Sequence, residues 1–275
     1  MAFFSNVLTI EKTGPVGTLW LDRPDKRNAI STEVWQALPD ALNELASDDE
    51  LGAIVFAGRG KSFCVGLDLA EFGGGTGAQE KPASQAAANL RQIDFTTRFQ
   101  EAITAIAKCP LPVIAVVHGH CLGGGIDLIT ACDIRVAAAD ASFGVRETRI
   151  GIVADVGTLQ RLPKVVNAGH VAELAYTGRD IDAARAEKIG LVNDVYADFD
   201  AAYAAAHDLA NQIAANSSMA VRGTKFILQQ SENLTTEQSL LLNGIYTMAT
   251  SLQSNDLREA MKAFIDKRPA KFTGT

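Results

Sequence analysis

A strand, a helix and a second strand follow one another between residues 109 and 140, and this run constrains the fold more than any other. The apolar segment "CPLPVIAVVHGH" begins as a proline-bounded buried strand. A turn from Gly119 to Gly125 follows, then the helical run "IDLITAC", then "DIRVAAAD", which has the composition of another strand. Because a helix separates the two strands, we expect crossover connections rather than a meander, and therefore an α/β fold.

Recognisable elements also precede this run. In "VLTIEKTGPVGTLWLD", apolar and polar residues alternate on both sides of a Gly-Pro-Val-Gly turn, which predicts a hairpin. The apolar run "AIVFAG" predicts a buried strand. Ser31 is placed to cap a helix that runs towards Ser47, which Pro39 should kink or split because proline has no donor. The glycine-rich residues 73–85 predict a flexible surface segment, followed by a long helix to about Lys108.

After about residue 200 the apolar pattern becomes helical throughout. We therefore predict a strand-and-helix core over residues 1–199 and a helical C-terminal region over residues 200–275. The periodic runs of this second region span 200–215, 218–231, 235–252 and 255–266.

Composition excludes several classes of protein. The 275 residues are 47% hydrophobic and 21% charged, as in a globular protein with a substantial core. A net charge of −7 without a Lys/Arg run argues against a nucleic-acid partner. No apolar stretch reaches the roughly 18 residues that a membrane helix needs, and the start "MAFFSNVLTIEKTG" lacks the features of a secretory signal. The four cysteines form no C-x-x-C pair, so we expect reduced, mostly buried thiols and a cytoplasmic location.

Two glycine-rich segments resemble nucleotide-binding motifs, but neither has the required spacing. In "GRGKS", Val55 stands where a phosphate-binding P-loop needs its first glycine. In "GHCLGGGIDL", Leu128 stands where a dinucleotide-binding fingerprint needs its third glycine. The sequence therefore implies no nicotinamide or flavin cofactor.

The same glycines have another possible use. Three glycines at a helix start leave backbone N–H groups exposed at the positive end of the helix, where they can hold an oxygen that becomes negative during a reaction. "SFCVGLDL" offers a second loop of this kind, in which Gly66 frees the N–H of Leu67. Two converging donors would make an oxyanion hole, whereas the simpler alternative is a pair of tight turns.

Three acids stand close to apolar runs, and a buried carboxylate without a partner is costly. Asp127 lies early in the helix after the glycines, where the simpler role for an acid is to compensate the helix dipole. Glu147 and Asp155 flank the apolar run in "RETRIGIVADVG". Glu147 could pair with a neighbouring arginine and Asp155 could cap a helix that begins near Gly157, so structural and catalytic roles both remain open.

Several stretches, in their order along the chain, resemble the enoyl-CoA hydratase/isomerase (crotonase) superfamily. The resemblance implies a crotonase-like spiral of ββα turns with a C-terminal helical trimerisation region, and homotrimers that pair into hexamers. It also implies acyl-CoA thioester substrates, a place in fatty acid β-oxidation, and no metal or redox cofactor. The matching pieces are "LDRPDKRNAI", "SFCVGLDL", "PVIAVVHGHCLGGGIDLITACDIRVA", "GTLQRLPKVV", "TGRDIDAARAEKIGLVNDVY" and "AFIDKRPAKF".

The superfamily motifs also imply a set of site residues. Its oxyanion hole consists of two backbone amides, which match Leu67 and Gly124 here. Hydratases of the superfamily carry glutamates at the positions of Asp127 and Glu147 and normally no acid at Asp155. The set Asp, Glu, Asp at spacings of 20 and eight residues resembles instead the dienoyl-CoA isomerases of the superfamily.

The implied reaction shifts a 3,5-dienoyl-CoA to a 2,4-dienoyl-CoA. Glu147 would take the C2 proton of the thioester while the N–H groups of Leu67 and Gly124 hold the oxyanion. Asp127, kept protonated in a dry pocket, would deliver a proton at C6. Asp155 would tune this pair or orient Glu147.

The same resemblance implies that CoA is held largely by backbone around residues 26–29 and 67–69. In the superfamily, two residues of the C-terminal segment can reach the CoA of a neighbouring subunit. The CoA-binding set implied here is Lys26, Ala29, Gly66, Asp68, Leu69, Phe264 and Lys267, and Arg27 departs from the small or apolar residue often found at its position.

Two alternatives remain. One is an enoyl-CoA hydratase that tolerates Asp127, although hydration needs a water molecule held between two carboxylates and the shorter side chain should loosen that grip. The other is a non-catalytic binding protein of the same fold, such as an RNA-binding relative. The acidic charge balance and the complete set of acids argue against it.

Overall fold

A seven-stranded sheet forms the centre of the computed structural model, which describes residues 2–73 and 83–275. The hairpin β2–β3 is antiparallel, and from β3 to β10 every neighbouring pair is parallel, so the predicted hairpin and crossovers are confirmed. The strands in order across the sheet are β1 (Ala2–Phe3), β2 (Leu8–Thr13), β3 (Val16–Leu21), β4 (Ala53–Gly58), β5 (Val113–Val117), β7 (Ile134–Ala138) and β10 (Asp194–Tyr196).

A second, three-stranded sheet contains an element that the sequence did not predict. It consists of β6 (His120–Leu122), β8 (Ser142–Gly144) and β9 (Ile181–Asp182). The prediction of an uninterrupted turn from Gly119 to Gly125 was therefore wrong. β6 forms because it pairs in parallel with β8 and because the Cys64 segment exchanges backbone hydrogen bonds with it on the other side, at 2.9 and 3.0 Å. Such long-range pairing leaves no local pattern in the sequence.

The two predicted helices before β5 are both present. α1 (Thr32–Ala46) begins where the Ser31 hydroxyl accepts a hydrogen bond from the N–H of Val34. Pro39 does not split α1, whose buried apolar face is continuous on both sides of it. α3 (Gln85–Lys108) is the predicted long helix. The flexible segment predicted before it falls largely on residues 74–82, outside the described residues.

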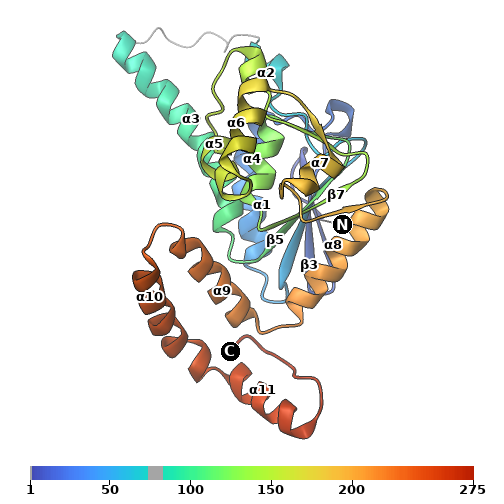
Figure 1. Cartoon of the computed structure of the whole chain (residues 1–275), viewed down its shortest axis with the longest axis vertical. Helices are drawn as coiled ribbons and strands as arrows, with labels where there is room; N and C mark the ends of the chain where they lie inside the picture. Colours follow the sequence, from blue (N-terminus) through green and yellow to red (C-terminus); the bar gives the residue numbers. More distant parts are fainter. Residues whose placement is uncertain (1, 74–82) are drawn as a thin grey trace.

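The sheet is covered on both faces, which explains why β4 is apolar at almost every position. Ile54 and Phe56 face the larger core, under α1, α3 and α4 (Gly124–Ala131), whereas Val55 faces the smaller core. α8 (Phe199–Ala214) covers this second face through its alanines (Figure 1). The predicted domain boundary at 199/200 stays a prediction, and α8 belongs to the packing of the sheet.

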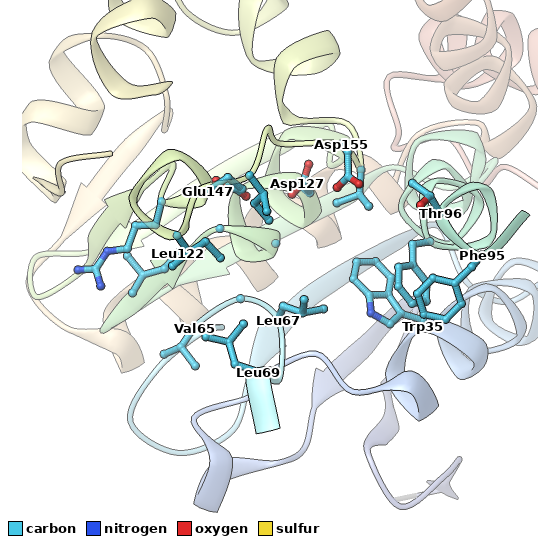
Figure 2. Close-up of a pocket in the computed structure, with 18 of the residues that line it drawn as sticks. Trp35, Val65, Leu67, Leu69, Phe95, Thr96, Leu122, Asp127, Glu147 and Asp155 are labelled. Carbon is cyan, nitrogen blue, oxygen red and sulfur yellow. The ribbon is translucent and has the colours of Figure 1, made fainter. Parts of the chain in front are cut away.

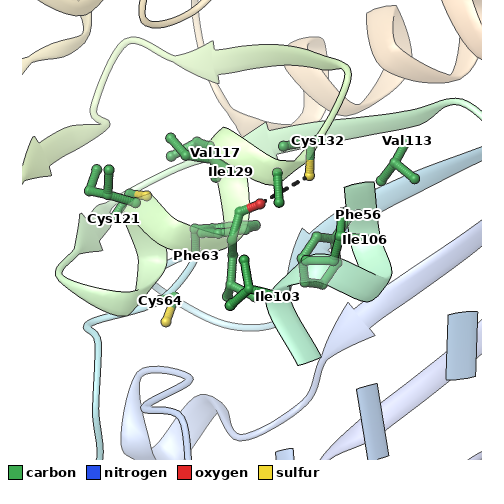
Figure 3. Close-up of a cluster of buried hydrophobic side chains, with 14 of the residues drawn as sticks. Phe56, Phe63, Cys64, Ile103, Ile106, Val113, Val117, Cys121, Ile129 and Cys132 are labelled. Atoms are coloured by element: carbon green, nitrogen blue, oxygen red, sulfur yellow. Dashed lines mark hydrogen bonds between the residues drawn. The ribbon is translucent and has the colours of Figure 1, made fainter. Parts of the chain in front are cut away.

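The larger core lies directly under α4 and the loop before it. Figure 3 shows Phe56, Phe63 and Ile103 packed there beside three cysteines. All four cysteines are free and buried, as expected, and the Cys132 thiol donates to the Leu128 carbonyl at 3.4 Å. A close-packed core of this kind gives α4 a rigid base.

The C-terminal helices lie at one end of the molecule, away from α2 and α4 (Figure 1). α9 (Ser218–Ser231) is attached to the core through Lys225, whose ammonium donates to Asp133 at 2.6 Å and to the Leu111 carbonyl at 2.9 Å. α10 (Thr236–Ala249) and α11 (Asn255–Asp266) confirm the predicted helical pattern. Their exposed apolar side chains are Leu240, Leu241, Ile245, Met248, Met261, Phe264 and Ile265.

None of the helices within the described ranges is long and apolar enough to cross a membrane.

The short helices connect these elements and carry much of the site. The remaining helices are η1 (Pro24–Lys26), α2 (Leu69–Gly73), η2 (Glu147–Ile150), α5 (Thr158–Arg161), η3 (Leu162–Lys164), α6 (Ala168–Thr177), α7 (Ala183–Lys188) and η4 (Ser251–Gln253).

Candidate active site

A cavity of about 500 Å³ lies between α1, α3, α4 and η2. Figure 2 shows all three predicted acids on its wall, with Asp127 between Glu147 and Asp155 in that view. Trp35 and Phe95 close one end, and Trp35 stacks on Phe99 with ring centroids 4.7 Å apart. The cavity therefore joins an aromatic end to a row of carboxylates.

The segment from Gly66 to Asp68 forms one side of this cavity. The Gly66 carbonyl accepts from the N–H of Ile30 at 2.8 Å, and the Asp68 N–H donates to the Ile30 carbonyl at 3.0 Å. Between these two bonds, the N–H of Leu67 has no acceptor among the described residues. Gly66 has φ +91°, and a Cβ there would lie 2.9 Å from the Leu122 carbonyl oxygen, so only glycine fits.

The second predicted donor is the N–H of Gly124, the first residue of α4, which lies beside that segment. Gly123 precedes it with φ +51° and is held by a hydrogen bond from its own N–H to the Gly144 carbonyl at 2.8 Å. As the first residue of the helix, Gly124 has no intrahelical acceptor for its N–H. A Cβ built on Gly66 would lie 3.5 Å from the Gly124 nitrogen. The two loops thus converge, which the sequence had left open.

Asp127 is completely buried on α4, with 0% of its surface exposed. One carboxylate oxygen, Oδ1, accepts a short hydrogen bond from the N–H of Thr158 at the start of α5. The other, Oδ2, has no partner in the described part of the chain. Burial raises the pKa of Asp127 to about 7; the hydrogen bonds from Thr158 lower this pKa and the charge of Glu147 raises it. Asp127 is therefore a carboxyl group that stays substantially protonated near neutral pH.

Glu147 lies in η2 and is 9% exposed. Its oxygen Oε2 is buried without a partner among the described residues, and Oε1 lies 3.5 Å from where a Cβ on Gly123 would be. Burial and, to a smaller extent, the charge of Asp155 raise the pKa of Glu147. The neighbouring arginines do not pair with it, because Arg146 binds Asp180 and the Arg149 side chain packs against Gly178.

Asp155 lines the cavity and is exposed. The expectation that it might cap a helix near Gly157 was wrong, because α5 begins without a side-chain cap from that turn and the N–H of Thr158 binds Asp127 instead. Its backbone carbonyl accepts from the Gln100 side chain at 2.6 Å, which ties the loop to α3.

The sequence did not identify Thr158 or the aromatic wall. Thr158 could be noticed only as the residue that opens a helix after Gly157, and its contact with Asp127 spans 31 positions. Trp35 and Phe99 follow the buried faces of α1 and α3 and look like ordinary core residues in the sequence. Only the fold shows that these faces reach the cavity.

The predicted CoA-binding residues fall into two groups. Gly66 and Leu69 line the cavity, and Lys26 is exposed. Two other residues of the set that lies near the cavity in sequence are not free to bind CoA through their side chains. Ala29 is buried, and the Asp68 carboxylate binds Arg23 at 3.0 Å. Phe264 and Lys267 belong to α11 and its C-cap, far from the cavity of their own chain (Figure 1).

The geometry suits the deprotonation of a carbon acid. Glu147 is a base whose raised pKa favours taking a proton, Asp127 is an acid that can give one, and two adjoining loops of the wall carry N–H groups without acceptors among the described residues. Within residues 2–73 and 83–275, no cluster of three or more His, Cys, Asp or Glu is placed to hold a metal ion.

Asp127→Asn should stabilise the fold increasingly as pH rises. The folded-state pKa of Asp127, about 7, lies above its ordinary value of 3.8, so its contribution to stability is complete below about pH 4 and is lost as pH rises through 7. Asparagine never ionises, and its Oδ1 can still accept from Thr158. The shift corresponds to at most about 4 kcal/mol in the free energy of unfolding.

Urea unfolding of both proteins at pH 5 and pH 8 measures this effect, and comparing the two pH values cancels any pH-independent change in packing. The advantage of the variant should be larger at pH 8 by about 1–3 kcal/mol. An equal difference at both pH values would mean that Asp127 ionises normally in the folded protein.

Comparisons with known proteins identify the family of the chain. Residues 11–275 match the family model described as enoyl-CoA hydratase/isomerase. The chain is 39% identical to a mitochondrial Δ(3,5)-Δ(2,4)-dienoyl-CoA isomerase of Dictyostelium discoideum, over 94% of the chain and 87% of that protein. It is 41% identical to the human mitochondrial protein of the same name, over 91% of the chain and 76% of that protein. A crystal structure of an enoyl-CoA hydratase from Bacillus anthracis superposes with a TM-score of 0.88 at 29% identity, covering 98% of the chain and 100% of that protein.

Proposed function

The chain belongs to the enoyl-CoA hydratase/isomerase family, and within that family we propose that it converts 3,5-dienoyl-CoA thioesters into 2,4-dienoyl-CoA thioesters. The fold is the crotonase fold, with an α/β spiral and C-terminal helices. The observation that carries the proposal is the buried Asp127, whose unpartnered oxygen belongs to a cavity lined also by Glu147, Leu67 and Gly124. The similarity to proteins named dienoyl-CoA isomerases supports the same reaction.

Proton removal is the first step. Glu147 takes a proton from C2 of the thioester, and the electron pair is delocalised onto the adjacent thioester oxygen and, in the other direction, along the conjugated chain to C6. The N–H groups of Leu67 and Gly124 stabilise that oxygen as it becomes negative, because neither is engaged by another acceptor in the described part of the chain. The reaction uses neither metal nor redox cofactor, since the only bonds that change are C–H and C=C.

Proton delivery at C6 completes the isomerisation. Asp127 donates from Oδ2 while its Oδ1 remains bound to the N–H of Thr158, which holds the carboxyl group in place. The charge on Glu147 favours the protonated form of Asp127 before the reaction, and that charge disappears once Glu147 has taken the C2 proton. The first transfer therefore prepares the second. Asp155 acts on Glu147, whose pKa its negative charge raises.

The acyl chain extends past the acids towards the aromatic end of the cavity. In Figure 2, Glu147, Asp127 and Trp35 follow one another in that direction, as C2, C6 and the tail of the substrate would. The CoA moiety extends from the other end, along Gly66 and Leu69. The backbone from Lys26 to Ala29 leads into Ile30, which is hydrogen-bonded to Gly66 and Asp68.

Ultraviolet absorbance separates the proposed activity from its alternatives. Purified protein is given 3,5-octadienoyl-CoA and, separately, a 2-enoyl-CoA. Growth of the conjugated 2,4-dienoyl thioester chromophore is the expected result. Loss of enoyl absorbance without dienoyl growth would identify a hydratase, and no change with either substrate would identify a binding protein.

Assembly into homotrimers that pair as hexamers is also part of the proposal. Phe264 is 85% exposed and Ile265 is 77% exposed, on a helix that touches little of its own chain. A neighbouring subunit would cover these side chains and would receive Phe264 and Lys267 beside its CoA site.

Removal of residues 255–275 should therefore abolish the trimer. The truncated chain would leave the neighbouring apolar surface exposed to water, and it should run as monomers or aggregates. Size-exclusion chromatography with light scattering, using the full-length chain as control, measures the outcome. A soluble truncated trimer would contradict the assembly.

A further inference from the structure

Arg23, in the segment "LDRPDKRNAI", joins two parts of the chain that flank the predicted oxyanion hole. Its guanidinium donates from Nη1 to the Ala29 carbonyl at 2.6 Å and from Nη2 to the Asp68 carboxylate at 3.0 Å. The Arg23 and Asp68 side chains are only 16% and 12% exposed. Ion pairs that are largely shielded from water are stronger and better ordered than pairs on the surface.

The loop that carries Arg23 is fixed from within. Asn28 has φ +56° and is buried; its side chain accepts from the Arg23 N–H at 2.9 Å and donates to the Ser62 carbonyl at 2.8 Å. Ile30 then makes the two backbone bonds to Gly66 and Asp68. The guanidinium thus projects from a rigid loop onto the residue that directly follows Leu67.

The direction of the Leu67 N–H depends on the peptide planes on either side of it. The two backbone hydrogen bonds of Ile30, to Gly66 and to Asp68, restrain these peptide planes. The peptide between Leu67 and Asp68 can still tilt if the Asp68 side chain is free to move. Arg23 removes that freedom by holding the Asp68 side chain against the Ala29 carbonyl. Arg23 itself does not line the cavity, so any effect on the reaction must pass through Asp68 and the backbone of Leu67.

We propose that Arg23 is a positioning residue, which orients the Leu67 N–H in the oxyanion hole by clamping Asp68 to Ala29. The inference rests on the role proposed above for Leu67. It also gives the Asp68 carboxylate a structural task within the protein, so that only its backbone is left to face CoA.

A clamp on an oxyanion donor acts mainly on the transition state, where the negative charge is largest. Removing such a donor entirely costs about 10²- to 10³-fold in kcat. Misaligning one costs part of that, so Arg23→Gln should lower kcat about 10- to 100-fold and leave KM within about threefold. Exchange of the C2 protons with deuterated water should fall by a similar factor, because it uses the same oxyanion.

Two further variants grade the effect. Arg23→Lys keeps the charge but has a single nitrogen, which cannot reproduce the planar fork to Ala29 and Asp68, so kcat should lie between those of Arg23→Gln and the native protein. Asp68→Asn keeps an acceptor for Arg23 and should also be intermediate. Arg23→Gln combined with Asp68→Asn should be no slower than Arg23→Gln alone, because both changes act on the same contact and Arg23→Gln already removes it.

Arg59→Gln is the matched control. Arg59 also forms a partly shielded ion pair, with Glu11 at 2.6 Å, but this pair lies beside Trp20 on the hairpin, outside the cavity. The control should lose some stability and keep kcat within about twofold, which separates loss of an ion pair from loss of the clamp.

The proposal is overturned if folded Arg23→Gln keeps kcat within about threefold of the native value, or if its loss appears wholly in KM. Should Arg23→Gln fail to fold, Asp68→Ala, which removes the acceptor altogether, decides by the same criterion. Failure of the proposed function itself would look different, since the native protein would then show no dienoyl isomerisation.

Discussion

Glu147→Gln should fold, bind acyl-CoA and isomerise dienoyl-CoA about 10³- to 10⁴-fold more slowly than the native protein. The amide has nearly the same shape but cannot take the C2 proton. No neighbour can substitute, because Asp127 is buried and substantially protonated, and Asp155 is exposed. A loss of this size corresponds to about 4–5.5 kcal/mol of transition-state stabilisation.

Initial rates at saturating 3,5-octadienoyl-CoA and the binding of a saturated acyl-CoA measure the two properties separately. Glu11→Gln is a suitable control, because Glu11 is a partly buried glutamate that binds Trp20 and Arg59 outside the cavity. If Glu147→Gln retained more than about a tenth of the native turnover, Glu147 could not be the base.

Asp127→Asn should separate two reactions that the native protein performs in one cavity. Isomerisation needs a proton at C6, which asparagine cannot supply, so it should fall steeply. Exchange of the C2 protons with deuterated water needs only Glu147 and the two N–H donors, so it should survive far better. The two losses should differ by more than about tenfold, or about 1.4 kcal/mol.

The same variant should be more stable than the native protein near pH 8, for the reason given above, so a loss of isomerisation cannot be blamed on unfolding. Asp140→Asn provides a control, since Asp140 contacts Gly119 on the exterior and lies outside the cavity. A parallel fall of isomerisation and C2 exchange would mean that Asp127 only shapes the site and is not the C6 donor.

Local patterns were sufficient to predict most of the architecture. The hairpin, the buried strand β4 and the Ser31 cap follow from alternation, apolar runs and a side-chain acceptor, all of which act over a few residues. β6 could not be predicted because three residues form a strand only through partners at Cys64 and β8. Pro39 removes one donor, but the packed face of α1 is sufficient to keep the helix continuous.

The candidate site, too, was predicted from the sequence only in part. The types and spacings of Asp127, Glu147 and Asp155 pointed to a set of acids, and the glycines pointed to free N–H groups. Their arrangement depends on contacts between distant segments. Thr158 binds Asp127 across 31 positions and Arg23 binds Asp68 across 45, and neither contact has a signature within its own segment.

The most direct test of whether Glu147 and Asp127 act as separate base and proton donor is where hydrogen from the solvent appears in the product. Isomerisation of 3,5-octadienoyl-CoA is run in deuterated water with native protein, and the 2,4-dienoyl product is examined by NMR. Asp127 exchanges with solvent before each turnover, so the product should carry one deuterium at C6, and C2 should carry deuterium only to the extent that Glu147 exchanges it before isomerisation. A product whose C6 carries the hydrogen removed from C2 would show that a single group shuttles the proton, and would contradict the assignment of Glu147 as base and Asp127 as donor.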